Sequence, residues 1–390
     1  MKKYYIYTFG CKVNQYESQL ISDKFKNDKF RCVHKPEEAD VVIFNSCTVT
    51  AEADKECEYF LRKTSKLTNR PKIILTGCLA KNTNIANLFP NIEIITDKTN
   101  LFSNTKTQTV TNFDNRSRAF LKIQDGCNNF CSYCVVPYVR NILWSKQKNE
   151  VLSEIETLVK NGYYEIVLTG IHIGKYQGGL SNLVSEIVKI PLNFRIRISS
   201  IELNEVDNNL IELMKANTDK ICNHLHIPLQ SGSDVVLKRM NRKYGTKIFE
   251  KKIIRLIHAL PYLALTTDII TGFPGETKEH HRETCQFVKQ IPFARLHIFR
   301  YSDRQGTKAS MFDQKVPSSE TKNRSKDLSE INSIKRINFL NQNIGLKRKA
   351  VKIGKGKALT DNYITVSDQN DKMDKKTGIF EIEVTESSSV

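Results

Sequence analysis

Three things are absent or scarce in this chain of 390 residues: a membrane-length apolar run, a secretory leader, and enough acidic side chains to match the basic ones. No apolar run reaches the roughly 18 to 20 residues that cross a bilayer, and the polar start MKKYYIYTFG is unlike a signal peptide. We therefore expect a cytoplasmic protein that uses no membrane.

The shortage of acids gives the chain a basic balance. There are 60 Lys and Arg residues against 42 Asp and Glu residues, so the net charge is +18. This charge favours a polyanionic partner, and RNA, DNA or an acidic membrane surface would each fit. Charge alone does not choose among them, because a lysine-rich proteome gives the same balance without a partner.

Ten cysteines in a chain without a leader do not indicate a disulfide framework, since the cytosol keeps thiols reduced. Cysteines at special positions are better explained by metal binding or catalysis. Four of them occupy no such position, and we expect them to be small buried apolar residues: Cys32, Cys57, Cys222 and Cys285.

The amino-terminal part repeats a strand followed by a cysteine and a helical run. Cys11 follows MKKYYIYTFG, Cys47 ends VVIFNSC, and Cys78 ends KIILTGC; NIEIIT supplies a further strand. This alternation predicts an open parallel α/β sheet within a domain assigned to residues 1–112, and the polar run from Ser103 to Arg118 is predicted to be a linker. The three cysteines should converge at the carboxyl ends of the strands, with helix N-termini behind them.

The middle part, residues 113–340, contains six strand-like segments alternating with helical patterns. The segments are AFLKIQD, EIVLTGI, FRIRISSIE, NHLHIPLQSG, LALTTDIITGF and ARLHIFRYS. They predict a partial (β/α)6 barrel with its active site at the carboxyl ends of the strands, followed by a linking helix after Pro317. Short strand signals in residues 341–390 predict a small all-β module.

The strongest motif follows the first strand of the middle part. In DGCNNFCSYCVVPYVR, Cys127, Cys131 and Cys134 are spaced CxxxCxxC. Three thiolates on one loop can hold three irons of a cubane cluster, and the open fourth iron can chelate S-adenosylmethionine for reductive cleavage. A structural zinc site is the alternative, although zinc prefers a fourth nearby Cys or His.

This loop resembles the hallmark of the radical S-adenosylmethionine superfamily, including the aromatic Tyr133 before the last cysteine. Together with TFGCKVNQYES, EIVLTGIHIG, RIRISSIE, HLHIPLQSGSD, TDIITGFPGET and HIFRYSDRQGT, it is similar to the methylthiotransferases, most closely those acting on threonylcarbamoyladenosine in tRNA. The likeness runs to about residue 340, and the tail resembles a short version of the RNA-binding TRAM barrel.

The resemblance implies a second [4Fe-4S] cluster on Cys11, Cys47 and Cys78, which handles sulfur. It also implies an enzyme that adds a methylthio group to carbon 2 of threonylcarbamoyladenosine beside the anticodon, with tRNA, a flavodoxin- or ferredoxin-type electron donor and a sulfur source as partners. The alternatives are methylthiolation of isopentenyladenosine tRNA or of a ribosomal-protein aspartate, or a non-catalytic iron-sulfur RNA-binding redox sensor.

Further residues are candidates for contacts with cofactor, substrate or RNA. Gly170, Ser199, Ser200, Gln230 and Tyr133 are expected near the methionine cofactor, although turn and barrel-filling roles are as plausible. Six tail cations suit phosphate contacts: Lys347, Arg348, Lys349, Lys352, Lys355 and Lys357. Tyr363 is a candidate for base stacking or for the core.

Three arginines, Arg195, Arg197 and Arg300, are candidate partners for a substrate carboxylate, with surface salt bridges as the alternative. His224 and His226 alternate along one strand and should both face the barrel lumen. The sequence departs from the family at Arg140-Asn141, where relatives have Arg-Gly, and in the shortened tail. Asn tolerates a positive φ, so the turn can survive this change.

The first prediction is that the reconstituted protein holds two four-iron clusters, one for each set of three cysteines. Converting Cys127, Cys131 and Cys134 to Ala should leave about half of the iron and abolish cleavage of S-adenosylmethionine, because the open iron is lost. Iron analysis and detection of 5′-deoxyadenosine measure the two effects. A single cluster in the wild type, with Cys11, Cys47 and Cys78 dispensable for methylthiolation, would contradict the assignment.

Overall fold

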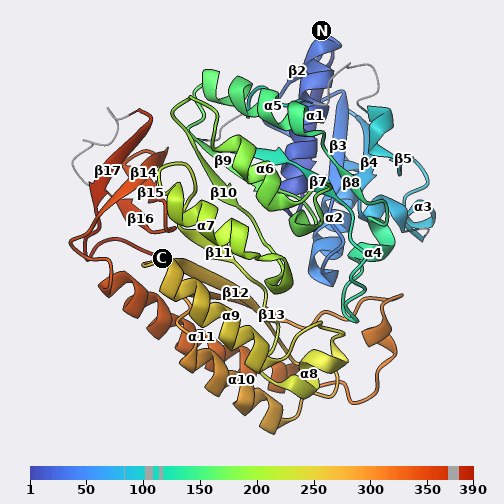
Figure 1. Cartoon of the computed structure of the whole chain (residues 1–390). Helices are drawn as coiled ribbons and strands as arrows, with labels where there is room; N and C mark the ends of the chain where they lie inside the picture. The colour runs from blue at the N-terminus through green and yellow to red at the C-terminus, as the bar shows by residue number, and fades with distance from the viewer. Residues whose placement is uncertain (83, 102–108, 114–116, 368–376) are drawn as a thin grey trace.

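The computed structural model describes residues 1–82, 84–101, 109–113, 117–367 and 377–390. Along the chain it forms a parallel sheet with helices, then a six-stranded barrel, then a small antiparallel sheet (Figure 1). The amino-terminal sheet and the carboxyl-terminal sheet lie on opposite flanks of the barrel (Figure 1). No helix in these ranges is both long and apolar enough to cross a membrane.

The amino-terminal sheet is parallel throughout, in the order β2-β1-β3-β4-β5. Its central strand β3 is buried along its whole length, which agrees with the apolar run VVIF and with helices on both faces. The two-residue strand β2 was not predicted. The bounds are β1 Lys3–Thr8, α1 Lys12–Asn27, β2 Arg31–Cys32, β3 Val41–Ser46, α2 Ala51–Thr64, β4 Lys72–Gly77, α3 Asn84–Leu88 and β5 Glu93–Ile95.

The barrel contains the six predicted parallel strands. Two three-stranded sheets are joined by bridges from Ile196 to Ile221 and from Ser200 to His226, giving the order β6-β9-β10-β11-β12-β13. The bounds are β6 Ala119–Lys122, β7 Gln124–Asp125, α4 Val136–Val139, β8 Trp144–Ser145, α5 Lys148–Lys160, β9 Glu165–Thr169, α6 Leu180–Ile187, β10 Arg195–Ile198, α7 Asn208–Ala216, β11 His224–His226, α8 Asp234–Arg239, α9 Thr246–Ala259, β12 Ala264–Thr271, α10 Lys278–Gln290 and β13 Arg295–Arg300.

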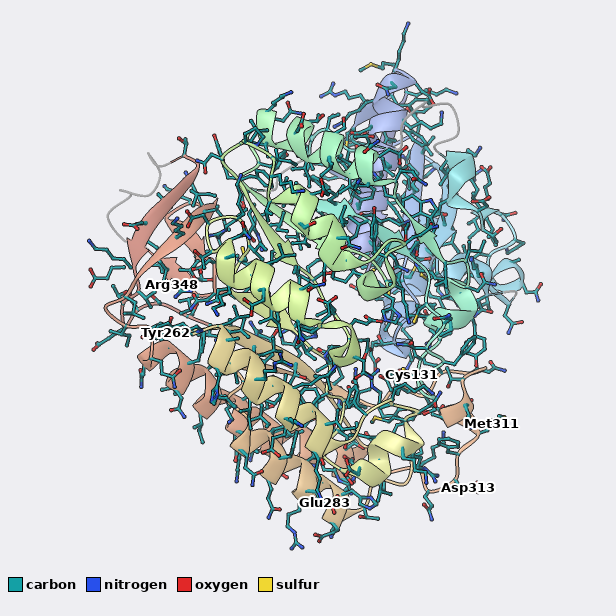
Figure 2. All side chains as sticks on the ribbon, in the orientation of Figure 1. Cys131, Tyr262, Glu283, Met311, Asp313 and Arg348 are labelled. Carbon is teal, nitrogen blue, oxygen red and sulfur yellow. The ribbon has the colours of Figure 1, made fainter. Side chains whose placement is uncertain are left out.

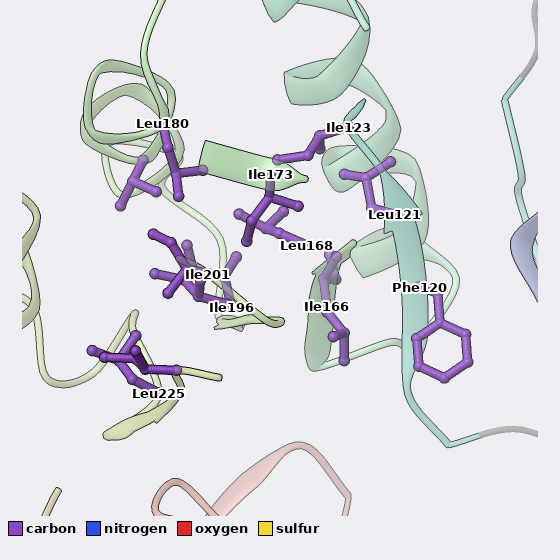
Figure 3. Packing of buried hydrophobic residues seen from close by; sticks show 14 of the residues in the cluster. Phe120, Leu121, Ile123, Ile166, Leu168, Ile173, Leu180, Ile196, Ile201 and Leu225 are labelled. Carbon is purple, nitrogen blue, oxygen red and sulfur yellow. The ribbon is translucent and has the colours of Figure 1, made fainter. Parts of the chain in front are cut away.

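One large apolar core joins the barrel to the amino-terminal sheet. It runs from Tyr16 on α1 to Phe120 on β6 and through the barrel residues in Figure 3. Val110 and Phe113 are buried in this core, although the sequence predicts a polar linker there. Parts of that linker, 102–108 and 114–116, lie outside the described residues. The shared core holds the two units in one arrangement.

The predicted linking helix is α11, Ser318–Asn341, and it leads into the carboxyl-terminal sheet. That sheet is antiparallel, in the order β16-β15-β14-β17. Its strands are β14 Lys347–Gly354, β15 Lys357–Thr360, β16 Thr365–Ser367 and β17 Ile379–Glu383, of which β15 was not predicted. Its core also packs against Ala264 and Ala294 of the barrel, which compensates for its small size.

A buried ion cluster fastens this sheet to the barrel. Glu165 accepts hydrogen bonds from Arg195 Nε and Arg197 Nε, each at 2.8 Å, and it is fully buried. The same guanidinium groups donate to four backbone carbonyl groups of the carboxyl-terminal sheet, those of Lys349, Leu359, Thr360 and Asp361. The prediction that Arg195 and Arg197 pair with substrate is therefore wrong, because all their donors face protein acceptors.

Other predicted contacts of the tail are also internal. The Tyr363 ring lies 4.6 Å from the His224 ring and 4.8 Å from the Arg197 guanidinium, so it packs rather than faces RNA. Arg348 pairs with Asp361 at 2.7 Å (Figure 2 labels Arg348), and Lys349 pairs with Asp219. Three predicted tail cations remain exposed on the surface: Lys347, Lys355 and Lys357.

The ion cluster gives the second prediction. Glu165→Ala leaves two buried arginines without their shared carboxylate, and breaking a buried pair in this way costs about 3–5 kcal/mol. Thermal unfolding of the variant should show a clearly lowered midpoint. Glu186→Ala is the control, because Glu186 pairs with Lys189 on the surface and should change the midpoint little. Equal midpoints for both variants would refute a docking role for Glu165.

Candidate active site between two sets of cysteines

Cys11, Cys47 and Cys78 follow β1, β3 and β4, which are neighbours in the sheet. As predicted, the three cysteines therefore stand at one edge. Gly10 brings the first turn close to the second: it has φ +84°, and a Cβ on it would lie 2.5 Å from Cys47 Sγ. Any larger residue at this position would push the Cys11 turn away from Cys47.

The expected helix N-termini are present only in part. Cys11 is the N-cap residue of α1, but α2 begins four residues after Cys47, and Cys78 precedes only a short 3₁₀ turn, Leu79–Lys81. Cys47 instead receives hydrogen bonds from backbone N–H groups in the loop after it. Burial raises the pKa of the Cys47 thiol to about 11, against the effect of these donors. Such a buried thiol loses its proton when a metal binds it.

Cys127, Cys131 and Cys134 lie on the loop after β7, near the carboxyl ends of the barrel strands (Figure 2 labels Cys131). Cationic groups contact two of these sulfur atoms. Arg242 donates to Cys131 Sγ at 3.3 Å, and His172 Nδ1 lies 3.6 Å from Cys127 Sγ. Donors of this kind stabilise anionic sulfur.

The rest of this loop is fixed by packing. Burial raises the pKa of Cys134 to about 12, while the N–H group of Val136 acts in the opposite direction. The Tyr133 ring packs on a small apolar cluster that includes Met240 and Phe273. Tyr133 therefore anchors the loop in this structure, and a contact with the cofactor remains a prediction.

Arg140 connects the two sets of cysteines. Its carbonyl oxygen accepts from the Cys127 N–H at 3.1 Å, and its Nε donates to Cys78 Sγ at 3.4 Å. The guanidinium also pairs with Glu17 at 2.9 Å and with Asp125 at 2.8 Å. A single residue thus contacts both sets, one through its backbone carbonyl and the other through its side chain.

The carboxylate of Glu17 lies at the centre of this ion network. It is buried and also pairs with Lys122, at 2.7 Å, and with Lys98. Burial opposes its charge, but the surrounding cations hold the pKa of Glu17 well below its usual range. The network borders a cavity of about 200 Å³ whose lining includes Cys78 and Arg140. The cavity therefore opens beside one cysteine of the amino-terminal set.

The departure from the family at Asn141 has no conformational cost. The sequence suggests that Asn must tolerate a positive φ here, but Asn141 is not among the residues with positive φ. The preceding Arg140 has φ −131°. The turn therefore does not require glycine.

The remaining predicted cofactor contacts lie at the carboxyl ends of barrel strands. Gly170 follows β9, and a Cβ there would lie 2.9 Å from the Gln124 carbonyl oxygen, so packing explains this glycine. Ser199 is buried and Ser200 is exposed after β10. Gln230 follows β11 with φ +75°, and its N–H donates to the Asp268 carbonyl oxygen at 2.8 Å. Contact of these residues with a cofactor remains a prediction.

The barrel lumen is polar between two apolar ends. On β12, Ala264 packs on the carboxyl-terminal sheet, and Ile270 packs on the cluster that also holds Tyr133. Thr266 and Asp268 lie between them on the same face, because side chains alternate along a strand. His224 and His226 both contact Thr266, which confirms that they share this face.

Burial lowers the pKa of His224 well below its usual value, with smaller contributions from Arg197, His226 and Lys12. Lys12, one of these cations, directly follows Cys11 of the amino-terminal set.

Sequence reasoning missed the polar groups around the cysteines. Asp125 directly precedes the cluster loop in DGC, Glu17 lies in NQYES, and His172 lies in LTGIH. Each stands within a motif that the sequence singled out, and this proximity was the available signal. Their roles depend on pairings across the fold, such as Arg140 with Glu17, which sequence spacing does not show.

Comparison with known proteins places family models on two parts of the chain. A model described as the radical SAM superfamily matches residues 121–288, and one described as uncharacterized protein family UPF0004 matches residues 3–97. Among solved structures, the radical S-adenosylmethionine methyltransferase TsrM from Kitasatospora setae, with cobalamin and a [4Fe-4S] cluster bound, has a TM-score of 0.56 at 13% identity. The match covers 76% of this chain and 74% of that one, and it shows a shared fold.

Curated relatives match most of the chain. The threonylcarbamoyladenosine tRNA methylthiotransferase MtaB of Bacillus subtilis is 40% identical over 80% of this chain and 76% of its own. The protein of the same name from Thermotoga maritima is 36% identical, covering 90% of this chain and 86% of its own. A tRNA-2-methylthio-N(6)-dimethylallyladenosine synthase from Endomicrobium trichonymphae is 35% identical over 82% of this chain and 81% of its own.

Proposed function

Because the chain belongs to the family of radical S-adenosylmethionine tRNA methylthiotransferases, we propose that it adds a methylthio group to carbon 2 of threonylcarbamoyladenosine beside the anticodon of tRNA. The observation that supports this proposal is that one residue, Arg140, contacts a cysteine of each triad, Cys78 and Cys127. A transfer reaction that uses one group to activate carbon and another to supply sulfur needs such adjacency.

The cofactors of this family are S-adenosylmethionine and two [4Fe-4S] clusters. We assign one cluster to Cys127, Cys131 and Cys134 and the other to Cys11, Cys47 and Cys78. Both triads fit a cluster, because each groups three free thiols and offers them N–H or cationic neighbours, which suit anionic thiolates. When bound, one cluster would supply an electron for cofactor cleavage, and the other would handle the sulfur that is transferred.

The protein's own residues position these groups and control their charge. Arg242 and His172 offset the negative charge of thiolates in the barrel triad, and Arg140 does so for Cys78. Tyr133 holds the loop by packing. Ser199, Ser200 and Gln230 are proposed to contact the methionine part of the cofactor, and Gly170 to let the backbone approach it.

The remaining parts of the proposal concern organisation and partners. We propose domains of residues 1–112, 113–340 and 341–390, the last a short TRAM-like RNA-binding module. A flavodoxin- or ferredoxin-type protein would supply electrons and a separate source would supply sulfur. A cytoplasmic location fits a tRNA-modifying enzyme.

The third prediction tests the substrate. The purified enzyme is offered tRNA from normal cells and tRNA from cells unable to make threonylcarbamoyl. Methylthiolation detected by nucleoside mass spectrometry should occur at carbon 2 of threonylcarbamoyladenosine and only in the first pool, because a site that pairs a carboxylate discriminates against its absence. Equal product in both pools, or product only on isopentenylated adenosine, would contradict the proposal and favour the synthase named above.

The fourth prediction concerns RNA binding by the tail. Replacing Lys347, Lys355 and Lys357 with Ala should weaken tRNA binding and reduce the salt slope by about 2 to 3 units, since each phosphate contact contributes close to one. These point changes keep the carboxyl-terminal sheet in place, so its carbonyl groups still pair with Arg195 and Arg197. Deleting the whole tail would remove those partners. The control replaces the exposed Lys160, Lys215 and Lys251 on helices α5, α7 and α9. Equal slopes for both triple variants would mean that the tail lysines do not meet phosphate.

A further inference from the structure

Three side chains from adjacent strands form a polar group in the barrel lumen: His226 on β11, Asp268 on β12 and His297 on β13. Their ligand atoms all lie within 4.8 Å of one another. Asp268 Oδ1 is 3.2 Å from His226 Nε2 and 3.5 Å from His297 Nδ1, and the two imidazole rings stack at 5.2 Å. One carboxylate oxygen therefore faces both rings.

These contacts fix the protonation of the ring atoms involved. Each nitrogen that faces Asp268 Oδ1 must carry a proton to donate to it, and His226 Nδ1 is engaged by Thr266 Oγ1 at 2.9 Å. Although burial opposes it, hydrogen bonds from His226 and His297 hold the pKa of Asp268 well below its usual range. A carboxylate behind an imidazole orients the ring and stabilises its cationic form.

His297 is the member of the group that offers a free atom to a ligand. In the part of the chain that the structure describes, His297 Nε2 has no hydrogen-bond partner, and the side chain is 40% exposed. Phe299 lies two residues further along the same face of β13 and is 47% exposed. The imidazole of His297, which contacts the Asp268 carboxylate, therefore lies beside the exposed ring of Phe299.

The group lies one layer below the cluster loop. Along β12, Asp268 is two residues from Ile270, which packs on the same cluster as Tyr133, so the layers are about 7 Å apart. This separation suits a substrate whose base lies near the loop and whose acyl side group extends into the lumen.

The three arginines that the sequence suggested as carboxylate partners do not fill this role. Arg195 and Arg197 are bound to Glu165 and to the carboxyl-terminal sheet. Arg300 is exposed, and the alternation of β13 puts it on the face opposite His297. The predicted role of Arg300 as a carboxylate partner is therefore unsupported by its position.

We propose that His297, held by Asp268, binds the carboxylate of the threonylcarbamoyl group, while Phe299 packs against the attached base. This inference rests on the proposed function and names the contact that selects its substrate. Because Nδ1 faces Asp268, Nε2 of His297 donates to a substrate carboxylate oxygen when the ring is protonated on both nitrogens. Asp268 is a positioning residue, because it acts on the substrate through His297.

The test compares two synthetic anticodon stem-loops that differ only at the substrate side group. One carries threonylcarbamoyladenosine and the other its methyl ester, which removes the negative charge and keeps the size close. Binding to the cluster-loaded enzyme is measured at equilibrium, and kcat/KM is measured for methylthiolation. The wild type should prefer the acid by about tenfold to a hundredfold, as expected for one charged hydrogen bond.

His297→Gln should bring this preference close to one in both measurements, because Gln cannot take up the second proton with which the imidazole pairs the carboxylate. His297→Lys places a cation at the position and should retain a preference for the acid. Asp268→Asn should reduce the preference for the acid, because it removes the carboxylate that orients His297. The change should appear mainly as a higher KM for the acid stem-loop. His258→Gln, at an exposed position on α9, is the matched control and should keep the wild-type ratio.

The ratio of the two affinities, acid over methyl ester, controls for misfolding, because damage to the fold lowers the binding of both stem-loops alike. An unchanged ratio in His297→Gln, or an equal loss for both RNAs, would overturn the proposal. So would zinc bound stoichiometrically in the wild type and absent from His297→Gln, since the group would then be a metal site. A wild type that acts on neither stem-loop but on isopentenyladenosine RNA would refute the proposed function itself, a result distinct from an unchanged ratio.

Discussion

The arrangement of the site depends on Arg140. Its carbonyl oxygen holds the Cys127 N–H, its Nε reaches Cys78 Sγ, and its guanidinium is fixed by Glu17 and Asp125. Buried charges are costly unless they are paired, so this side chain has little freedom to move once the network has formed. The amino-terminal sheet is thereby held against the barrel at the point where the two cysteine triads meet.

At the other end of the lumen, the carboxyl-terminal sheet provides partners for a second set of buried charges. Glu165 and two arginines are buried there, and the backbone of the small sheet supplies the acceptors that they lack within the barrel. The sheet closes that end of the lumen and in return gains a core it is too small to build alone. Between this end and the cluster that holds Tyr133, the lumen is lined by His226, Asp268 and His297.

Sequence patterns predicted the elements within longer apolar or alternating segments and missed two short strands. Six apolar segments gave the six barrel strands, while β2 and β15 are only two and four residues long and carry too little pattern. The cysteine triads were predicted because their spacing and their position after strands are local features. Arg195 and Arg197 were misjudged because their partners lie elsewhere in the chain, at Glu165 and beyond Lys349. The His297 group was missed for the same reason, since its members come from three strands and meet only through their register.

The central claim is that two clusters lie within one site, separated by the length of one arginine. Electron paramagnetic resonance of the reduced protein tests it, because neighbouring paramagnetic clusters split or broaden each other's signals. Spectra are recorded for the wild type and for the two variants that each lack one cysteine triad. The account predicts that the wild-type spectrum differs from the sum of the two variant spectra, through magnetic coupling. A wild-type spectrum equal to that sum, with full occupancy of both clusters, would show isolated clusters and contradict it.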